Sequence, residues 1–510
     1  MNDAYDAVIV GAGPNGLSAA IRLAESGLST LLVEAEDRVG GAVKTDELTL
    51  PGFLHDTFSS VYPAAAASPV FARMPLEKHG LRFAHPSVAM AHVLDGGQGA
   101  SLCKDLDRTA ESLDGLHRGD GEGWREFITP YLDNWDNLSR AMLEGFPPVW
   151  GGLRAALGLG FTGSLEAARM ILQPAAATAA ELFSGDGSRA WLYGSALHGD
   201  VAPTAAGSTV FGFYLNLLGH VAGWPVAEGG SGRLSGALAG YFEELGGEIR
   251  TGSPVERVVS SNGRVRGVVA GGEEIRTSLA LCDVTPRGLL GLAGASLPES
   301  YKKKLARYRY GPGSLKIDWA LSGPAPWEYE AAREAGTLHI GGGTREIEEG
   351  ISQEKLGHLP EKPFMLAAQP SVPDPTRAPE GQHTLWAYTH VPHGMDWGAK
   401  TEEHVERMEA QVERFAPGFR DLVIGRHVMT PTDLEGRNRN LIGGDVNDGS
   451  QAPDQLFFRP LPSLSPYRTP LRGLYIGSAA TFPGGAVHGV PGDASARAAL
   501  NDIKLRRVKT

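Results

Sequence analysis

The chain contains very little cysteine. Its two cysteines are Cys103 and Cys282, and the absence of a C-x-x-C pair argues against a disulfide framework and a dithiol redox centre. No run of 18 or more apolar residues occurs, so the sequence predicts no membrane-spanning helix. No basic segment with a long apolar core precedes the first apolar run. We therefore expect a cytoplasmic location, with peripheral membrane contact as an alternative.

Basic residues are outnumbered. Lys and Arg total 47 against 59 Asp and Glu, which gives a formal net charge of −12. This balance disfavours nucleic-acid binding and general attraction to anionic lipid. Of the 510 residues, 42% are hydrophobic and 21% charged, which predicts a folded chain of more than one domain. We expect a small-molecule partner and no nucleic acid, and the oligomeric state stays open.

The first informative stretch begins at Ala7. A short apolar run from Ala7 to Val10 precedes glycines in G-x-G-x-x-G spacing, an alanine-rich helical segment and a second apolar run, Thr30 to Val33. This order predicts a strand, a tight turn, a helix and a strand, with a dinucleotide pyrophosphate held at the turn. The alternative is a glycine-rich turn between core elements. The predicted contact residues are Gly11, Gly13, Pro14, Asn15 and Gly16.

An acid and a glycine pair follow that turn. Glu34 ends the second predicted strand, where a carboxylate can accept hydrogen bonds from ribose hydroxyls. Arg38, Gly40 and Gly41 then predict a loop that brings backbone and positive charge against phosphate. An ordinary surface turn is the alternative.

The fingerprint together with Arg38-x-Gly40-Gly41 resembles the FAD motifs of glutathione-reductase-type flavoproteins, in the branch that holds amine oxidases and phytoene desaturase-like enzymes. The stretch from Gly473 to Gly492 closely resembles the C-terminal FAD motif of phytoene desaturase-like proteins. The resemblance implies FAD as cofactor. Besides the residues named above, it implies FAD contacts from Ala35, Ala42, Ser59, Ser60, Val61, Val255, Gly477, Ser478, His488, Gly489 and Val490.

The resemblance also implies where these residues meet the cofactor. Ser59 to Val61 would lie near the isoalloxazine, Val255 beside the adenine, and Gly477 at the pyrophosphate or ribityl chain. His488 to Val490 would approach the flavin. One departure is Asp493-Ala494, where relatives often carry Arg-Asn. A fixed negative charge near the flavin would oppose its reduction, although Asp493 can also cap a helix.

Pattern and resemblance together predict an α/β fold with a Rossmann-type FAD-binding domain of the glutathione reductase type. That domain is discontinuous, from residues 1–65, 226–285 and 425–510. Residues 66–225 are predicted as a helical insertion or substrate cap, where Trp124 to Met142 form one helical face. That face is a core stripe or, as the alternative, a wall of the substrate cavity. Residues 286–424 are predicted as an α+β substrate domain with an antiparallel sheet.

Catalytic residues are harder to identify, and we leave them unknown. His220 is a weak candidate because imidazole titrates near neutrality, and a buried histidine bonded to backbone is the alternative. His383, His390 and His393 lack metal-ligand spacing, so we predict no metal site. The glycine-rich stretch from Leu338 to Thr344 could be mistaken for a second nucleotide fingerprint. It is not one, because Glu346 stands where the third glycine would be.

The leading functional hypothesis comes from the resemblance. It implies an FAD-dependent oxidoreductase that desaturates an apolar isoprenoid or polyene substrate by hydride transfer to flavin N5, with oxygen or a quinone as electron acceptor. One alternative is a flavin amine oxidase acting on a C–N bond. Another is an FAD-bearing, non-catalytic protein that binds a partner. The apolar segment from Phe146 to Phe161 predicts a buried turn or, alternatively, a contact with lipid headgroups.

Overall fold

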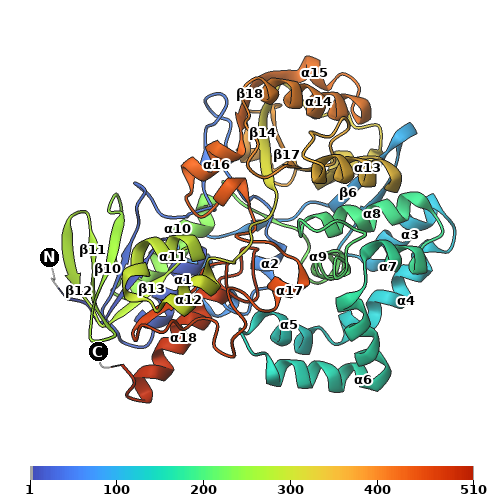
Figure 1. Cartoon of the computed structure of the whole chain (residues 1–510). Helices are drawn as coiled ribbons and strands as arrows, with labels where there is room; N and C mark the ends of the chain where they lie inside the picture. Colours follow the sequence, from blue (N-terminus) through green and yellow to red (C-terminus); the bar gives the residue numbers. More distant parts are fainter. Residues whose placement is uncertain (1–3, 509–510) are drawn as a thin grey trace.

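The computed structural model describes residues 4–508 (Figure 1). A parallel five-stranded sheet has the order β19-β13-β1-β2-β9. Its strands come from three separated stretches of the chain, namely β1 (Ala7–Val10), β2 (Thr30–Val33), β9 (Glu248–Arg250), β13 (Leu279–Cys282) and β19 (Leu474–Ile476). The Rossmann-type unit is therefore assembled from segments that are distant in sequence.

Alternation along β1 explains how this sheet is covered on both faces. Ala7 and Ile9 pack into a core with helices α1 (Pro14–Ala24), α10 (Gly232–Glu244) and α18 (Val490–Lys504). Val8 and Val10 pack with an antiparallel sheet of β10 (Val255–Ser261), β11 (Arg264–Ala270) and β12 (Glu273–Arg276), at the left of Figure 1. Successive residues of a strand point to opposite faces, so the apolar run of β1 is buried on both.

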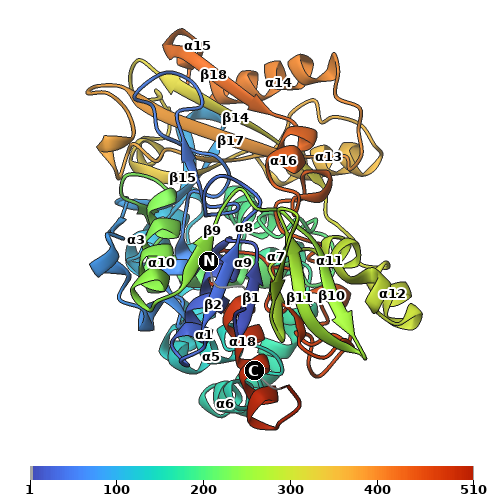
Figure 2. The same cartoon turned by 90° about the vertical axis from the view of Figure 1, so that its left-hand side faces the viewer.

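A second, seven-stranded sheet has the order β18-β14-β17-β16-β15-β6-β7. All its pairs are antiparallel except β15 with β6, which is parallel. The strands are β6 (Val88–Leu94), β7 (Gln98–Leu102), β14 (Gly313–Leu321), β15 (Ala335–Ile340), β16 (Met365–Ala368), β17 (His383–Val391) and β18 (Val423–Met429). Figure 2 shows β14, β17 and β18 above β1 and β2, with α14 (Lys400–Phe415) farther out.

The seven-stranded sheet corrects two parts of the domain prediction. β6 and β7 lie within residues 66–225, so this segment is not only a helical insertion. Their residues are mostly apolar and buried, as suits strands inside a covered sheet. β18 crosses the predicted boundary at residue 424 because it pairs with β14 as an edge strand.

Seven helices between β7 and residue 225 make up the helical part of the segment predicted as an insertion or substrate cap, and we refer to them as the cap. They are α3 (Leu106–Leu116), α4 (Asp120–Asp133), α5 (Trp135–Leu143), α6 (Val149–Leu172), α7 (Ala175–Leu182), α8 (Asp186–Leu197) and α9 (Thr209–Ala222). The predicted face from Trp124 to Met142 is divided between α4 and α5 by a break at Asn134. Trp124, Ile128 and Tyr131 are buried in one apolar cluster, which favours a core stripe.

Apart from the 12-residue α13, the remaining α-helices and strands that the structure describes have eight residues or fewer. They are β3 (Thr45–Asp46), β4 (His55–Asp56), α2 (Pro63–Ala66), β5 (Phe83–Ala84), β8 (Val226–Ala227), α11 (Pro286–Ala293), α12 (Glu299–Leu305), α13 (Thr344–Lys355), α15 (Phe419–Leu422), α16 (Pro431–Arg437) and α17 (Pro453–Leu456). Between residues 4 and 508, none of the helices combines the length and the apolar character needed to cross a bilayer.

Candidate functional site

Close backbone contacts shape the glycine turn after β1. Gly11 has a φ of +97°, a conformation that other residues rarely adopt. A Cβ at Gly16 would lie 1.9 Å from the carbonyl oxygen of Gly11, so only glycine lets α1 pack this tightly behind β1. Gly13 is the N-cap of α1 and has no side chain to cap it, and Pro14 occupies the first turn. The helix N-terminus therefore faces the turn, as pyrophosphate binding requires.

Glu34 lies against this turn from the end of β2. Its Oε2 accepts the Ala12 N–H at 2.6 Å, and its Oε1 accepts the Glu36 N–H at 3.0 Å. An ionised carboxylate has about four lone-pair sites, which leaves acceptors for ribose hydroxyls. The backbone of Ser253, two residues before Val255, donates to the Glu34 carbonyl oxygen at 2.8 Å. The predicted adenine-side residue is therefore close to the predicted ribose-side acid.

The second glycine loop packs directly on the first. The Gly40 N–H donates to the Ala12 carbonyl at 2.9 Å, and a Cβ at Gly41 would lie 3.0 Å from the Cα of Gly13. Ala35 and Arg38 lie in the exposed connection between Glu34 and this loop. Arg38 forms an ion pair with Asp46, so its charge already has a partner. The structure thus brings the two glycine motifs together, while the phosphate role of Arg38 stays a prediction.

The segment predicted near the isoalloxazine touches the same loop. Ser59 Oγ donates to the carbonyl of Ala42 at 3.1 Å, and Ser60 Oγ donates to Asp56 Oδ2 at 2.5 Å. Val61 forms an antiparallel bridge with Val226 at the start of the block that returns to the five-stranded sheet. These residues therefore connect the second glycine loop to α10 and its surroundings.

The C-terminal motif meets the N-terminal one. A Cβ at Gly492 would lie 1.8 Å from the carbonyl oxygen of Asn15, and one at Gly489 would lie 2.3 Å from Ser18 Oγ. Ser68 Oγ donates to the carbonyl of His488 at 2.6 Å. Burial lowers the pKa of His488 to about 4, so its imidazole is neutral near pH 7. The start of α18 thus packs on the start of α1.

The middle of that motif follows β19. The Gly477 N–H donates to the carbonyl of Cys282 at 3.0 Å, and Ser478 Oγ accepts the Ala480 N–H at 3.1 Å. Gly477 and Ser478 therefore lie at the carboxyl end of the sheet, beside the end of β13. Asn15 Oδ1 is buried there without a hydrogen-bond partner in the protein. An unpaired acceptor beside two glycine-lined turns fits a dinucleotide with donor groups.

Asp493 is fully balanced by basic groups. Arg73 Nη2 lies 2.5 Å from Oδ1, Arg22 Nε lies 3.3 Å from Oδ1, and Arg497 Nε lies 2.9 Å from Oδ2. Asp493 itself is 2% exposed. Three guanidinium groups around one carboxylate remove the expected net negative charge. Asp493 is therefore no argument against reduction of the flavin.

Asp283, which directly follows β13, occupies a position that the sequence did not suggest. Its Oδ2 accepts the Gly16 N–H at 2.9 Å, at the N-terminus of α1. Burial raises the pKa of Asp283 to about 7, the Gly16 N–H opposes that rise, and the nearby Glu34 adds to it. A group near half-protonation thus lies where an anionic pyrophosphate is expected.

The seven-stranded sheet has an apolar outer face and a polar inner face. Leu315, Ile317 and Trp319 of β14 pack with Val405 and Met408 of α14 on the outer face. The opposite, inner face carries ionisable and aromatic side chains in adjacent register, with Ser314 opposite His390, Lys316 opposite Tyr388 and Asp318 opposite Trp386. This polar face is largely buried against the rest of the molecule rather than exposed to solvent.

A buried ionic group joins the inner face to β4. Lys316 Nζ donates to Asp318 Oδ2 at 2.5 Å, and His55 Nδ1 lies 3.6 Å from Asp318 Oδ1. Burial raises the pKa of Asp318 to about 6 against the opposing charge of Lys316. Burial and the charge of Lys316 lower the pKa of His55 to about 3, so this imidazole is neutral. The inner face therefore points toward the segment that contains Ser59 and Ser60.

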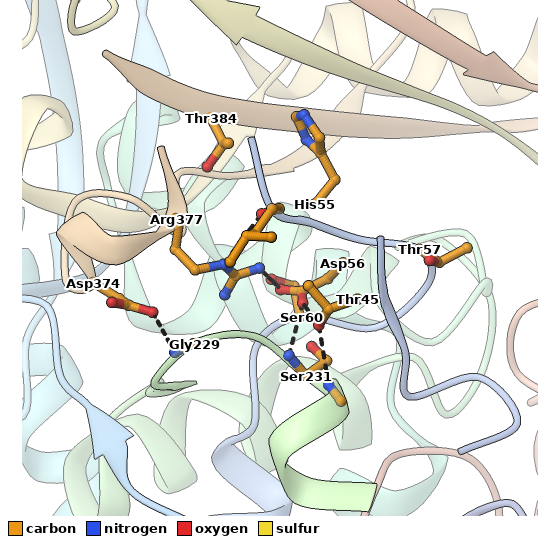
Figure 3. A network of polar contacts seen from close by, with 12 residues as sticks. Thr45, His55, Asp56, Thr57, Ser60, Gly229, Ser231, Asp374, Arg377 and Thr384 are labelled. Carbon is orange, nitrogen blue, oxygen red and sulfur yellow. Dashed lines mark hydrogen bonds and ion pairs between the residues drawn. The ribbon is translucent and has the colours of Figure 1, made fainter. Parts of the chain in front are cut away.

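Asp56 and Arg377 form a second buried connection, shown in Figure 3. Arg377 Nη2 lies 2.6 Å from Asp56 Oδ2, and both side chains are 0% exposed. Asp56 Oδ1 also accepts the Ser231 N–H at 2.8 Å and Thr45 Oγ1 at 3.0 Å. Burial would raise the pKa of Asp56, but the charge of Arg377 and these donors lower it. The carboxylate therefore ties β3, β4 and the start of α10 to the connection between β16 and β17.

His220, the predicted weak catalytic candidate, has both nitrogens engaged. Its Nε2 accepts the Trp124 indole N–H at 3.0 Å, and its Nδ1 lies 3.4 Å from the carbonyl of Lys104. Burial lowers its pKa to about 4. This arrangement favours the alternative of a structural histidine. Among residues 4–508, no three His, Cys, Asp or Glu side chains are grouped to bind a metal ion.

Sequence reasoning missed Asp56, Asp283 and the buried inner face. Asp56 lies four residues before Ser60, so its position in a cofactor-proximal segment was the available signal. Asp283 follows the buried run of β13, and a charged residue at the end of a parallel strand is a signal for the ligand-binding edge. No local signal reveals which face of β17 is turned inward.

Comparisons with known proteins agree over nearly the whole chain. The family model for flavin containing amine oxidoreductases matches residues 15–498. Pyridine nucleotide-disulfide oxidoreductase domain-containing protein 2 of Rattus norvegicus is 30% identical over 98% of this chain and 94% of its own. A limonene dehydrogenase component of Castellaniella defragrans is 24% identical over 98% and 95%. A lycopene-forming phytoene desaturase of Paracoccus is 25% identical over 97% of each chain.

Solved structures resemble the fold. An oxidoreductase from Methanosarcina mazei superposes with a TM-score of 0.64 at 16% identity, over 97% of this chain and 99% of its own. Cyclohexylamine oxidase from Brevibacterium oxydans gives a TM-score of 0.61 at 17% identity, over 98% and 99%. At these identities the likeness shows the fold alone.

Proposed function

Because the chain belongs to the flavin-containing amine oxidoreductase family and is thereby an FAD-dependent oxidoreductase, we propose that it desaturates an apolar substrate of isoprenoid or polyene type. When bound, FAD supplies a two-electron oxidant that accepts a hydride from a C–H bond. The share of the protein is to hold cofactor and substrate, to exclude water and to balance charge. The names of a phytoene desaturase and a limonene dehydrogenase component among its relatives support an apolar substrate.

The exposed apolar side of α6 is the observation that carries the proposal. Trp150 is 73% exposed and Leu157 74%, and Phe161, which follows a break in helical geometry at Gly160, is 82% exposed. Ala155 and Met170 of α6 pack instead into the apolar cluster that contains Trp124. Its charged residues are Arg154, Glu166 and Arg169, and the last two form an ion pair. An apolar stripe with so little charge suits the interface of a lipid bilayer, where apolar substrates dissolve.

We therefore place the α6 side against a lipid surface. The net charge of −12 opposes binding to anionic lipid, so the proposed surface is zwitterionic. A second copy of this chain is the competing occupant of the stripe, and the vesicle test in the Discussion separates the two. For the electron acceptor we propose oxygen or a quinone, in keeping with a sequence that carries one dinucleotide fingerprint.

Oxidation of an amine is the second candidate. The carboxylates of Asp200 and Asp445 favour it, because each lies 3.4 Å from where a Cβ at Gly311 would be and a carboxylate pair can bind an ammonium group. The fold shared with cyclohexylamine oxidase is compatible with this activity but does not select it. The two candidate functions differ in the charge of the substrate, because a hydrocarbon is neutral and an ammonium group is positive.

Anaerobic reduction of the purified holoprotein tests the choice. Phytoene and limonene in detergent micelles are mixed with the enzyme, and putrescine and cyclohexylamine are mixed with it separately. We expect the oxidised flavin absorbance to be lost with a hydrocarbon and retained with the amines. Loss with an amine alone would establish the second candidate. Retention with all four would favour the non-catalytic FAD-binding alternative.

A further inference from the structure

An unusual acid–histidine pair lies on the inner face of the seven-stranded sheet. His390 Nε2, on β17, lies 2.6 Å from Oδ1 of Asp200, which lies in the loop after α8. The Asp200 side chain is 2% exposed, whereas His390 keeps 12%. Tyr388, two residues before His390 on the same face, also keeps accessible surface while Trp386 is buried. The pair is thus buried at the carboxylate and accessible at the imidazole.

The pair connects to the predicted flavin loop through one residue. Asn447 Nδ2 donates to Asp200 Oδ2, and it lies 3.3 Å from the carbonyl oxygen of His198. On its other side, Asn447 Oδ1 lies 3.0 Å from where a Cβ at Gly485 would be. Gly485 belongs to the glycine loop between β19 and α18. A single side chain therefore separates Asp200 from the loop that resembles the C-terminal FAD motif.

The backbone at Asp200 is held in a rare conformation. Its φ is 55°, in the left-handed region, which aspartate enters more often than most other residues besides glycine. Such a conformation persists where surrounding contacts enforce it, and it is concentrated at functional sites. A structural ion pair does not need this geometry, because two side chains can meet from ordinary strand and helix positions. The backbone conformation at Asp200 therefore supports a functional role for its carboxylate.

Several ionisable groups face the imidazole from the elements around it. Burial would lower the pKa of His390, but the charge and hydrogen bonding of Asp200 outweigh burial, and Glu354 and Asp445 add to the rise. Burial raises the pKa of Asp445 to about 6, with Asp200 adding to that rise. His198, on the other side, is neutral because burial and the charge of His390 lower its pKa to about 3. The surroundings therefore strengthen His390 as a proton acceptor.

We propose that His390 accepts the proton that the substrate loses during desaturation, and that Asp200 is its positioning residue. This inference rests on the proposed function. The Asp200 carboxylate, 2.6 Å from Nε2, favours the imidazole proton on Nε2 by its charge, which leaves the lone pair on Nδ1 as the base. One substrate C–H bond is lost as a hydride to FAD. The adjacent C–H bond gives its proton to His390 Nδ1, and its electron pair becomes the new C=C bond. Two electrons thus leave the substrate, and FAD is the oxidant.

The test measures how fast phytoene reduces the flavin, at pH values from 5.5 to 9, in the anaerobic holoprotein. In the wild type we expect the rate to rise with pH as His390 loses its proton. His390→Gln should be about 100-fold slower or more, with a flat pH profile, because general base catalysis is lost. Asp200→Asn should move the rising part of the profile to lower pH, because His390 loses its anionic partner. His383→Gln, a change on the same strand outside the cluster, should match the wild type.

A second readout does not depend on turnover. In holoprotein labelled with carbon-13 at histidine Cε1, the NMR signal that disappears in His390→Gln should titrate above pH 6.5, and below that value in Asp200→Asn. A wild-type flavin that neither phytoene nor limonene reduces would overturn the proposed function and this inference together. A wild type that is reduced, with His390→Gln retaining its rate and pH profile, would overturn this inference alone. So would a histidine signal that Asp200→Asn leaves unmoved.

Discussion

Asp56 and Arg377 form an ion pair 2.6 Å long in which neither side chain has any exposed surface. More than three hundred residues of sequence lie between them, and they join the glycine-motif side of the molecule to the sheet above it. Removing one partner of such a pair leaves the other charge buried without compensation.

Asp56→Asn should therefore destabilise the protein by about 3–5 kcal/mol, the usual cost of breaking a buried pair. The measurement is the urea midpoint of unfolding, followed by far-UV circular dichroism. The control is Glu349→Gln, which breaks the exposed pair with Arg345 and should leave the urea midpoint close to that of the wild type. Equal midpoints for the two variants would show that Arg377 finds another partner.

Glu34→Ala should weaken FAD binding about tenfold to a hundredfold, because charge-assisted hydrogen bonds to the ribose hydroxyls are lost. Quenching of FAD fluorescence on titration with apoprotein measures the dissociation constant. Glu36→Ala removes a neighbouring, exposed carboxylate and should leave that constant unchanged. Unchanged affinity in Glu34→Ala would show that the Glu34 carboxylate binds only the Ala12 and Glu36 backbone N–H groups and not the ribose.

Asp283 should make FAD binding sensitive to pH. Its pKa of about 7 means that the carboxyl becomes anionic as the pH rises through neutrality. The negative charge of Asp283 at the N-terminus of α1 then repels the pyrophosphate, so the affinity for FAD should fall between pH 6 and 8. Asp283→Asn should flatten this dependence. A wild type whose affinity is constant over that range would show that Asp283 lies outside the reach of the phosphates.

The same group should affect the apoprotein. The folded-state pKa of Asp283 lies above the ordinary value of 3.8, so its proton stabilises the folded state. That contribution is complete below about pH 4 and is lost as the pH rises through 7. Urea midpoints of wild-type and Asp283→Asn apoprotein, measured from pH 4.5 to 8, should therefore differ in slope. Parallel curves would contradict the raised pKa.

Phe161→Glu should abolish binding to zwitterionic vesicles, because it places a charge in the most exposed part of the α6 stripe. Cosedimentation with phosphatidylcholine vesicles measures the bound fraction, and thermal melting should be unchanged. Leu464→Glu, at a side chain that is 81% exposed elsewhere, is the matched control. Vesicle binding that survives in Phe161→Glu would refute the lipid contact. Light scattering of the wild type that shows a dimer, lost in Phe161→Glu, would assign the stripe to a second copy.

The fold class and the FAD cofactor could be predicted from the sequence. The family match confirms the cofactor, and the solved structures confirm the fold. The glycine motif can be recognised in the sequence because G-x-G-x-x-G has a fixed local geometry. The individual cofactor contacts remain predictions. The inner face of β17 could not be foreseen, because alternating polar and apolar residues ordinarily indicate one face in water. In this protein the polar face of β17 packs against the rest of the molecule, and this orientation depends on tertiary packing.

The packing of Gly492 against Asn15 also sets an order for folding during synthesis. β1 and α1 leave the ribosome more than four hundred residues before β19 and α18, which complete their sheet and helix layer. At about 5–20 residues per second, that interval lasts roughly 20 to 90 seconds. For that time the core on the α1 side of β1 lacks α18, so part of its apolar surface stays uncovered until the last segment emerges.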